Sequence, residues 1–454
     1  MFKEKYIGDS AFYKRTLKLA LPLMLQGLLV SLAGLLDNLM VSGLGDSFLS
    51  GVAASNRFFI IYNFGVLGVT VASGVFIGQY LGAHNKGKMQ ESFRASIILA
   101  YLIALPFFIL ILFFPNLVLS FFTSDSSIIA AGTDYYRAIV YSIIPLTLSL
   151  AISGAIRSTG DTISPIYASI VGVVVNVVFN FLLINGAFGF PKLGVFGAGM
   201  ATLISRFVEL ALLLMILKVR QYDFNTKVKD IFKIDKKLFS LISKNAFNTG
   251  MNEIMWASSM AVLMKFYATR GPAAMSAYAV AGSISDLFFV LFNGMSAATT
   301  VLVAHHLGAN EYDKAKLNAN RLIFFSVMLA ILLGMVLIII SGFVPLIYKD
   351  ISSEAQMISV QLLRVIGSLF WVFMYNVQIL FMLRAGGDSL SAFIMDSGFM
   401  WLVNIPIVGF FTYFTNIPIV LLYIIGQATD LIKLTVSTIV YRRENWVKNV
   451  TEFK

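Results

Sequence analysis

Two acidic residues stand inside long apolar stretches of this sequence. Asp37 lies in Leu-Leu-Asp-Asn-Leu-Met-Val and Glu253 lies in Asn-Glu-Ile-Met-Trp-Ala, and neither has a basic residue one helical turn away. A carboxylate in an apolar environment binds a proton or attracts a cation, because its charged form is poorly solvated there. Both residues are therefore candidates for reversible binding of H⁺ or Na⁺. The alternative is a carboxylate that only bonds a neighbouring helix.

Three uncharged polar residues extend this chemistry. Asn176 and Asn180 are four residues apart, so a helix places both amides on one face. Amide carbonyl oxygens suit Na⁺ as hard ligands, and they also accept from a protonated carboxyl group. Thr202, in Gly-Ala-Gly-Met-Ala-Thr, offers a hydroxyl group. The alternative for each of them is a hydrogen bond between helices, which such side chains commonly make in membranes.

Other charged residues of the apolar stretches favour structural interpretations. Arg206 and Glu209 are three residues apart, as are Asp430 and Lys433, and such pairs can neutralise each other along a helix. Five further charges have no partner that the sequence identifies: Arg57, Arg137, Asp286, Arg364 and Asp396.

Signatures of enzymes are missing from the sequence. The three histidines, His84, His305 and His306, match no zinc spacing, and there is no cysteine and no phosphate-binding Gly-Lys-Ser/Thr loop. We therefore expect neither an enzyme nor a cofactor, and H⁺ or Na⁺ is the one expected ion. The net charge of +11 does not indicate nucleic-acid binding, because its distribution is explained by membrane topology.

The elements that must position these residues are membrane-spanning helices. Hydrophobic residues make up 58% of the chain and charged residues only 13%, against about 25% charged residues in soluble domains. Apolar runs of about 20 residues recur along the chain, and backbone groups in lipid must bond internally, so the runs predict helices. An all-α integral membrane protein follows, with spans at 16–42, 51–81, 92–115, 133–156, 163–186, 194–218, 239–267, 277–306, 318–345, 357–383, 391–412 and 417–441.

The chain also repeats itself. Gly78–Ala83 reads Gly-Gln-Tyr-Leu-Gly-Ala, and Ala304–Ala309 reads Ala-His-His-Leu-Gly-Ala, an offset of 304 − 78 = 226. A duplicated membrane protein is typically a transporter with its site between the two copies. We predict two six-helix bundles related by pseudo-two-fold symmetry: an N-terminal lobe at 1–218, a cytoplasmic linker at 219–244 and a C-terminal lobe at 245–454.

Positive charge predicts the orientation of these spans. One set of ends and loops, which includes both termini and the linker, carries 25 Lys and Arg residues, whereas the opposite set carries Lys192, Arg270 and Lys349. Lysine and arginine are retained on the cytoplasmic side of membranes. We therefore expect a multi-pass protein of the cell membrane with cytoplasmic N- and C-termini.

Several motifs, in order and spacing, resemble one family over almost the full length. They are Leu21–Gln26 (Leu-Pro-Leu-Met-Leu-Gln), Gly78–Ala83, Arg157-Ser-Thr-Gly-Asp161, and Asn252-Glu253-x2-Trp256 at the start of the second half. With Asp37 and the Asn176/Asn180 pair, they are similar to bacterial MATE (multidrug and toxic compound extrusion) transporters.

The resemblance implies a secondary active multidrug exporter that exchanges H⁺ or Na⁺ for lipophilic, cationic compounds. Alternating access to a central cavity between the lobes, in a monomer in the lipid bilayer, is part of that expectation. It places the cation near Asp37 with Asn176, Asn180 and Thr202, and Na⁺, if it is the ion, at Asp37, Asn176 and Asn180. Glu253 resembles acids that other members use in the second lobe, with Asn252 and Trp256 as supporting residues.

One residue departs from the family pattern. Many members carry Asp where Asn180 stands, so Asp37 is the one acid of this cluster and the ion stays open between H⁺ and Na⁺. A flippase for a lipid-linked precursor, on a related scaffold, is the alternative function. Such proteins often carry extra spans and a strongly cationic cavity, whereas twelve spans and two interior acids favour the exporter.

Overall fold

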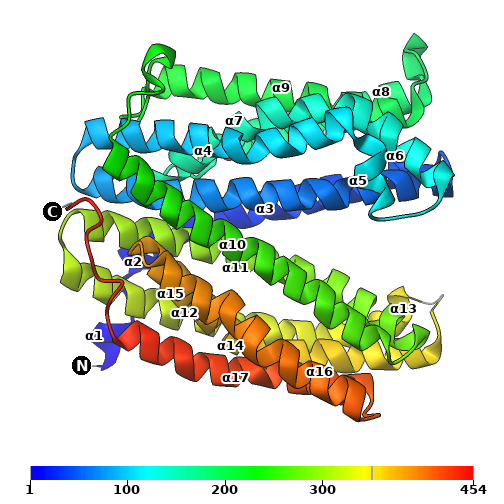
Figure 1. Cartoon of the computed structure of the whole chain (residues 1–454). Coiled ribbons are helices and arrows are strands. Elements are labelled where there is room, and N and C mark those ends of the chain that lie inside the picture. The colour runs from blue at the N-terminus through cyan, green and yellow to red at the C-terminus, as the bar shows by residue number, and fades with distance from the viewer. Residues whose placement is uncertain (1, 349–350, 453–454) are drawn as a thin grey trace. The chain divides into compact units, whose positions relative to one another are not determined.

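The computed structural model describes residues 2–348 and 351–452, and in these ranges the chain forms helices and no strand (Figure 1). Lys349, one of the three basic residues predicted for the outer side, lies outside the described residues. The all-α prediction is confirmed. The longer helices are α2 (Ser10–Ser42), α3 (Asp46–Gly82), α4 (Lys86–Phe113), α6 (Ser126–Ile139), α7 (Ile143–Ser158), α8 (Ile163–Asn185), α9 (Gly194–Arg220), α10 (Lys236–Ala268), α11 (Pro272–Gly308), α12 (Tyr312–Ser341), α14 (Ser353–Ala385), α16 (Ile405–Phe414) and α17 (Ile419–Arg442).

Two of the predicted spans are built from several elements. The fourth joins α6 to α7 through the short helix η1 (Val140–Ser142). The eleventh consists of α15 (Ser389–Phe393), the π-helical stretches η4 (Ile394–Gly398) and η5 (Met400–Asn404), and α16. Each of the twelve predicted spans therefore has its helix.

Among the described residues, eleven helices are long and apolar enough to cross a membrane. The helix outside this group is α10, which has the length of α2 but carries Asn245, Asn248, Asn252 and Glu253 along its middle. Its polarity is what a helix needs in order to present polar groups inside a lobe rather than to lipid.

The duplication predicted from sequence extends to the backbone. Helices α2 and α10 begin 236 − 10 = 226 residues apart, and α3 and α11 both begin and end at the same offset. The turn after each of the latter helices contains a residue in the left-handed region, His84 at φ 55° and Asn310 at φ 60°. The first two helices of each half therefore have the same lengths, and the turns that follow α3 and α11 have the same geometry.

Two compact units make up the chain, one of residues 25–250 and the other of residues 1–24 and 251–454. Their boundaries lie within α2 and α10, whereas the predicted lobes, 1–218 and 245–454, follow the ends of spans and stay a prediction. In the 25–250 unit, α8 packs along α9, and α3 packs on α4, α6 and α7. The fully buried Tyr62 joins α3 to α7 through a hydrogen bond with Thr147 of 2.7 Å.

In the other unit, α14 is the central helix and packs against α11, α12 and α17. Its contact with α12 depends on two facing glycines, since a Cβ at Gly367 would lie 2.7 Å from the Gly334 carbonyl oxygen. Aromatic rings fill the contact with α11, where Phe292 and Phe370 have centroids 4.5 Å apart. Small residues allow close helix approach, which is how membrane helices pack without a hydrophobic driving force.

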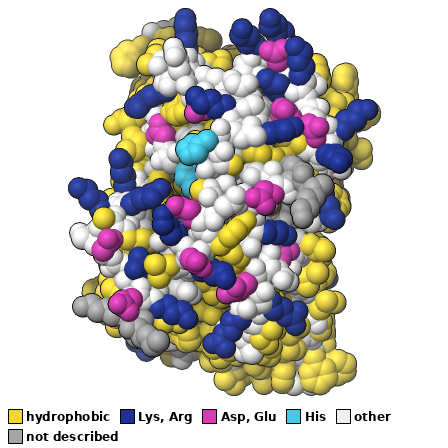
Figure 2. Space-filling model, turned by 90° about the vertical axis from the view of Figure 1, so that its left-hand side faces the viewer, with side chains coloured by type: hydrophobic (Ala, Val, Ile, Leu, Met, Phe, Trp, Pro, Cys, Tyr) yellow, Lys and Arg dark blue, Asp and Glu magenta, His cyan; other side chains and the backbone are white. Residues whose placement is uncertain are grey.

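The surface carries two kinds of side chain in different places, basic ones on one face and large apolar ones on the sides of the helices. Figure 2 shows many Lys and Arg side chains gathered on one face, the one at the left of Figure 1 where α1 (Phe2–Tyr6) lies. Helix sides, in contrast, expose large apolar side chains, among them Phe113, Val219, Ile339, Leu402 and Phe414. Exposed apolar surface of this extent indicates contact with lipid.

Candidate functional site

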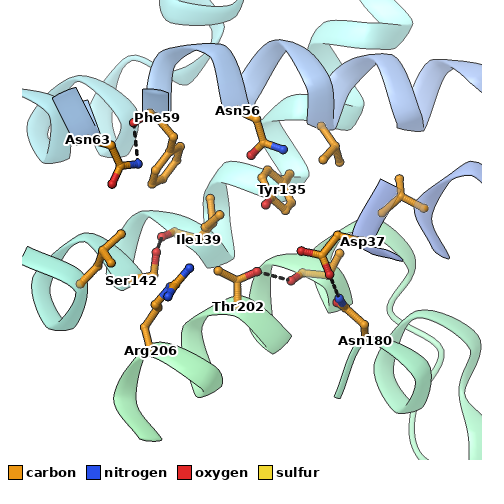
Figure 3. Close-up of a pocket in the computed structure, with 14 residues that line it drawn as sticks. Asp37, Asn56, Phe59, Asn63, Tyr135, Ile139, Ser142, Asn180, Thr202 and Arg206 are labelled. Atoms are coloured by element: carbon orange, nitrogen blue, oxygen red, sulfur yellow. Dashed lines mark hydrogen bonds between the residues drawn. The ribbon is translucent and has the colours of Figure 1, made fainter. Parts of the chain in front are cut away.

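A small pocket lies within the 25–250 unit, lined by side chains from α2, α3, α6, α8 and α9 (Figure 3). Its volume is about 170 Å³, below the roughly 300–1,000 Å³ of pockets that hold drug-sized ligands. The pocket therefore has room for an ion with a few water molecules. Asp37, Asn180 and Thr202, three of the residues singled out from sequence, line it.

Hydrogen bonds connect the predicted residues in one chain. Asn180 Nδ2 donates to Asp37 Oδ1 at 2.5 Å and to Asn176 Oδ1 at 3.3 Å. Asn176 Nδ2 in turn donates to Thr202 Oγ1 at 3.3 Å. The i, i+4 spacing on α8 places both amides on the face toward α2 and α9, as the sequence indicated. The structure therefore brings Asp37, Asn176, Asn180 and Thr202 together.

One acceptor of this group has no donor. Asn180 is 2% exposed, and its Oδ1 has no hydrogen-bond partner among the described residues. A buried acceptor left unpaired costs free energy, on the order of 1–3 kcal/mol, until a donor or a cation reaches it. The Asn180 oxygen and the half-buried Asp37 carboxylate together offer hard oxygen ligands, so this donor set fits Na⁺ as well as H⁺.

Arg206 combines its predicted ion pair with a place in the pocket. It does pair with Glu209, at 2.7 Å, as predicted. Its guanidinium group also lines the pocket with Asp37, which a purely structural pair would not do (Figure 3). Asn56, Asn63 and Tyr135 line the same pocket and were not singled out. Asn56 and Asn63 lie two helical turns apart on α3, a spacing that could have indicated a shared face, whereas Tyr135 comes from α6 and only folding brings it to them.

Glu253 does not have the isolation that the sequence suggested. Arg384 Nη2 of α14 lies 2.8 Å from its Oε1, and the Arg384 side chain is only 3% exposed. The expectation of a carboxylate without a basic partner was therefore wrong for Glu253. Arg384 is one of the 25 basic residues that the sequence assigns to the cytoplasmic side, and its side chain is buried at the last turn of α14. Whether Glu253 couples to an ion stays a prediction.

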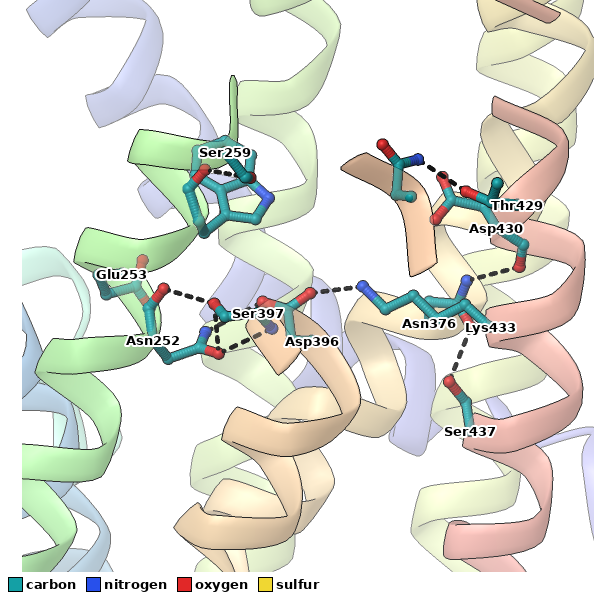
Figure 4. A network of polar contacts seen from close by, with 12 residues as sticks. Asn252, Glu253, Ser259, Asn376, Asp396, Ser397, Thr429, Asp430, Lys433 and Ser437 are labelled. Atoms are coloured by element: carbon teal, nitrogen blue, oxygen red, sulfur yellow. Dashed lines mark hydrogen bonds and ion pairs between the residues drawn. The ribbon is translucent and has the colours of Figure 1, made fainter. Parts of the chain in front are cut away.

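Asn252 and Trp256 lie on the same helix as Glu253 and have partners of their own. Asn252 Nδ2 donates to Asp396 Oδ2 at 3.0 Å, and its carbonyl oxygens accept from Ser397 (Figure 4). The backbone carbonyl of Trp256 accepts from Ser259 at 2.6 Å. These residues belong to the unit of residues 1–24 and 251–454, so they form a group separate from the Asp37 pocket.

Lys433 forms its ion pair with Asp396, 37 residues away in the sequence, and not with Asp430, which the spacing had suggested. Lys433 Nζ bonds Asp396 Oδ1 at 2.5 Å. Both side chains are buried, Lys433 at 7% and Asp396 at 8% exposure. Figure 4 shows Lys433 pointing from α17 toward Asp396. The neighbouring helix supplies a closer carboxylate than the turn of α17 does, so the local pairing was a wrong prediction.

A duplicated bundle of long apolar helices, with an ion-sized polar pocket inside one repeat, defines a multi-pass membrane transport protein. The MatE family model matches residues 22–182 and 249–412, one stretch in each half, and the chain therefore belongs to the MatE family.

Relatives and solved structures agree with this assignment. The chain is 26% identical over 406 residues to the Probable multidrug resistance protein YoeA of Bacillus subtilis, covering 88% of this chain and 86% of that protein. It is 23% identical over 445 residues to the Probable multidrug resistance protein NorM of Thermotoga maritima, covering 96% and 93%. A crystal structure of MATE in the bent conformation superposes with a TM-score of 0.87 at 18% identity over 95% of both chains. The fold prediction is therefore confirmed.

Proposed function

We propose that this protein is a secondary active multidrug exporter that takes up H⁺ or Na⁺ in exchange for lipophilic, cationic organic compounds. The supporting observation is the Asp37 cluster, where a carboxylate and an unpaired amide oxygen meet in a pocket of ionic size. Relatives with a quarter of the sequence in common carry the name multidrug resistance protein. The alternative flippase finds no support in these names.

Alternating access is the proposed mechanism, with the two lobes opening a central cavity to one side of the membrane at a time. A cation that binds at Asp37 must then bind one state better than the other, because a ligand shifts a conformational equilibrium only by its differential affinity. Asp37 belongs to α2, which carries Pro22 within its helix. A proline interrupts the backbone hydrogen bonds of a helix, so α2 has a point at which it can bend when the Asp37 charge changes.

A membrane position with cytoplasmic termini, and a monomer as the working unit, complete the proposal. The basic residues of the turn after α3 and of the 221–235 segment support the orientation, since Lys86, Lys88 and Arg94 all lie beside that segment. Positive residues remain on the cytoplasmic side during insertion.

Efflux measurements test this function. Ethidium accumulation in an efflux-deficient bacterial host should fall on expression of the wild type, and Na⁺ and external pH are varied separately. Faster efflux with an inward gradient of only one of the two ions identifies that ion. Unchanged accumulation under both gradients, with protein present in the membrane, contradicts the exporter.

A further inference from the structure

The unit of residues 1–24 and 251–454, here named the C-terminal unit, contains a buried ion pair that the proposed exchange at Asp37 does not use. Lys433 and Asp396 are 7% and 8% exposed, and their charged atoms are 2.5 Å apart. Asn252 Nδ2 donates to the second oxygen of Asp396, so this carboxylate has a donor at each oxygen. A buried lysine and a buried aspartate that bond each other are electrically balanced.

A third charge disturbs this balance. Asp430 precedes Lys433 by one turn on α17 and lies within electrostatic range of both Lys433 and Asp396. No hydrogen bond or ion pair to its carboxylate is found among the residues that the structure describes. Two carboxylates and one ammonium group carry a net charge of −1 when all three are ionised. In an apolar lobe, such a group lowers its free energy by taking up one positive charge.

Among the described residues, the neighbouring helices place no further basic group on Asp430. Tyr267 of α10 and Tyr423 of α17 face Asp430, and Tyr278 of α11 packs on both rings. Phenol groups are neutral near neutral pH. Arg384 of α14 acts on Asp396, but its charge is already balanced by Glu253.

The first repeat holds a related arrangement, in which the threonine, the basic residue and the asparagine that contacts the threonine stand at equivalent positions. Asn404 Nδ2 donates to Thr429 Oγ1 at 2.7 Å, as Asn176 does to Thr202 in the Asp37 pocket. Thr429 and Thr202 are 429 − 202 = 227 residues apart, and Lys433 and Arg206 are 433 − 206 = 227 apart. The Asn404 Oδ1 atom, like that of Asn180, is buried without a partner among the described residues. Each repeat thus places a cation, a threonine and an unsatisfied amide oxygen together.

The two repeats differ by one residue in this region. The helix-capping residues Asp161 and Asp388 are 388 − 161 = 227 apart, but Asn176 and Asn404 are 404 − 176 = 228 apart. The second repeat therefore has one additional residue between its cap and Asn404. The π-helical stretches η4 and η5 lie in that interval, and a π-turn accommodates one residue more than an α-turn. Asp396 lies in η4, so the additional residue changes the direction of side chains at the position from which the Asp396 carboxylate contacts Lys433.

We infer that Asp396, Lys433 and Asp430 form a second proton-binding site, in which one proton neutralises the three charges. The site belongs to the C-terminal unit and goes beyond the proposed exchange at Asp37. A proton fits better than a metal ion, because donors occupy both oxygens of Asp396. Among the described side chains of this group, the Asp430 carboxylate and Asn404 Oδ1 are the acceptors for which no donor is found. Hard metal ions require more oxygen ligands than these, whereas a proton needs one carboxylate oxygen and one acceptor.

Infrared difference spectroscopy of the full-length protein in lipid nanodiscs tests this site without any transport. Spectra are recorded over about pH 5 to 9, where buried carboxyl groups titrate, and protonated carboxyl groups give a resolved C=O band. The background variant is Asp37→Asn, which removes the pocket carboxylate of the first repeat. We expect this variant to keep a carboxyl band, and we expect the additional change Asp430→Asn to remove it, because Asp396 and Lys433 then balance.

Lys433→Met, in the same background, tests the charge balance by removing the ammonium group instead of a carboxylate. Two carboxylates without an ammonium group should take up two protons, so the band should grow about twofold and titrate at higher pH. Lys433→Arg should restore the band intensity of the Asp37→Asn background. A band that survives Asp430→Asn, or a Lys433→Met spectrum identical to that of the background, overturns the inference. Loss of the band on adding Na⁺ at constant pH overturns it as well, in favour of a sodium site.

The two proposals fail separately. Efflux lost in Asp37→Asn, with the C-terminal band intact, supports the exporter and the second site together. A missing band in variants that still export ethidium overturns the second site alone. Thermal unfolding of each variant, measured in the same nanodiscs, confirms that the spectra come from folded protein.

Discussion

The guanidinium group of Arg384 lies 2.8 Å from the carboxylate of Glu253, and it joins the last turn of α14 to the middle of α10. Arg384 is almost completely buried, so its charge depends on this one carboxylate for balance. The relationship makes Glu253 a structural counter-ion in the described state.

We expect Glu253→Gln to destabilise the protein, because it leaves a buried guanidinium group unpaired. Removing one partner of a buried pair costs roughly 3–5 kcal/mol. The double variant Glu253→Gln/Arg384→Met should regain most of the lost thermal stability. Unfolding midpoints of the wild type, both single variants and the double variant form the measurement, and strictly additive losses would refute the pairing.

Asp37→Asn should abolish cation-driven ethidium efflux while it leaves the amount of protein in the membrane unchanged. The amide cannot bind a proton in exchange, although it keeps the shape of the side chain and can still contact Asn180. Asn63→Asp serves as a matched control, since it places a carboxylate elsewhere in the same pocket without changing Asp37. Efflux at the wild-type rate from Asp37→Asn would show that Asp37 is not the coupling residue.

Asn180→Asp should change the ion preference of the pocket. In the present structure the Asn180 amide nitrogen lies 2.5 Å from Asp37 Oδ1 and donates to it. The variant replaces this donor with a second carboxylate and so adds negative charge to the pocket. Two carboxylates with the Asn176 and Thr202 oxygens make a stronger Na⁺ site, so we expect ethidium efflux to become more dependent on Na⁺. Initial rates at several Na⁺ concentrations and fixed pH measure this, and an unaltered Na⁺ response would contradict the assignment of these residues.

Gly334→Ala should weaken the contact of α12 with α14. A Cβ at this position would overlap the carbonyl oxygen of Gly367, which is backbone and cannot move aside. Overpacking of this kind costs typically 1–3 kcal/mol, which is about the expected loss of stability. Gly282→Ala is the control, because nothing lies within 4 Å of its added Cβ. If both variants unfold at the same temperature, the two glycines do not determine the helix contact.

The segment after α9 is held by a hydrogen bond that responds to pH. Tyr222 donates to Asp161 Oδ2 at 2.6 Å. Burial of Asp161 opposes ionisation, but hydrogen bonds from Ser164 and Tyr222 outweigh it and lower the pKa of this carboxyl group below its ordinary value. Burial and the bond to Asp161 raise the pKa of Tyr222 to about 12, so the phenol stays a donor.

Tyr222→Phe should therefore lower stability by about 1 kcal/mol at neutral pH, the usual contribution of one hydrogen bond. The pKa of Asp161 is lower in the folded state than in the unfolded state. This stabilisation is therefore fully present at pH values above the unfolded-state pKa. It is lost as the pH falls through the folded-state pKa, which lies below the ordinary value of this carboxyl group. The difference in unfolding midpoint between wild type and variant should shrink over that range. A difference that is independent of pH would show that Asp161 is not its source.

Much of the architecture follows from the sequence because it depends on local properties. Apolar runs of membrane length predict helices wherever they occur, and the repeated motifs at an offset of 226 predict two equivalent halves. The i, i+4 spacing of Asn176 and Asn180 likewise determines that both amides share a face. Asp37 and Thr202 could be added to them because a family pattern already joined them.

Tertiary structure alone decided the partners of the interior charges. Glu253 and Arg384 are 131 residues apart, and Asp396 is bonded by Lys433 of a different helix rather than by anything on its own. Helices α10, α14 and α17 could each be rotated about its own axis in many ways that still bury the apolar side chains. Only the packing of whole helices brings particular side chains within about 3 Å, and electrostatic pairing acts at that distance. Local spacing therefore predicted the elements, while the contacts between helices decided which charges remain for ion binding.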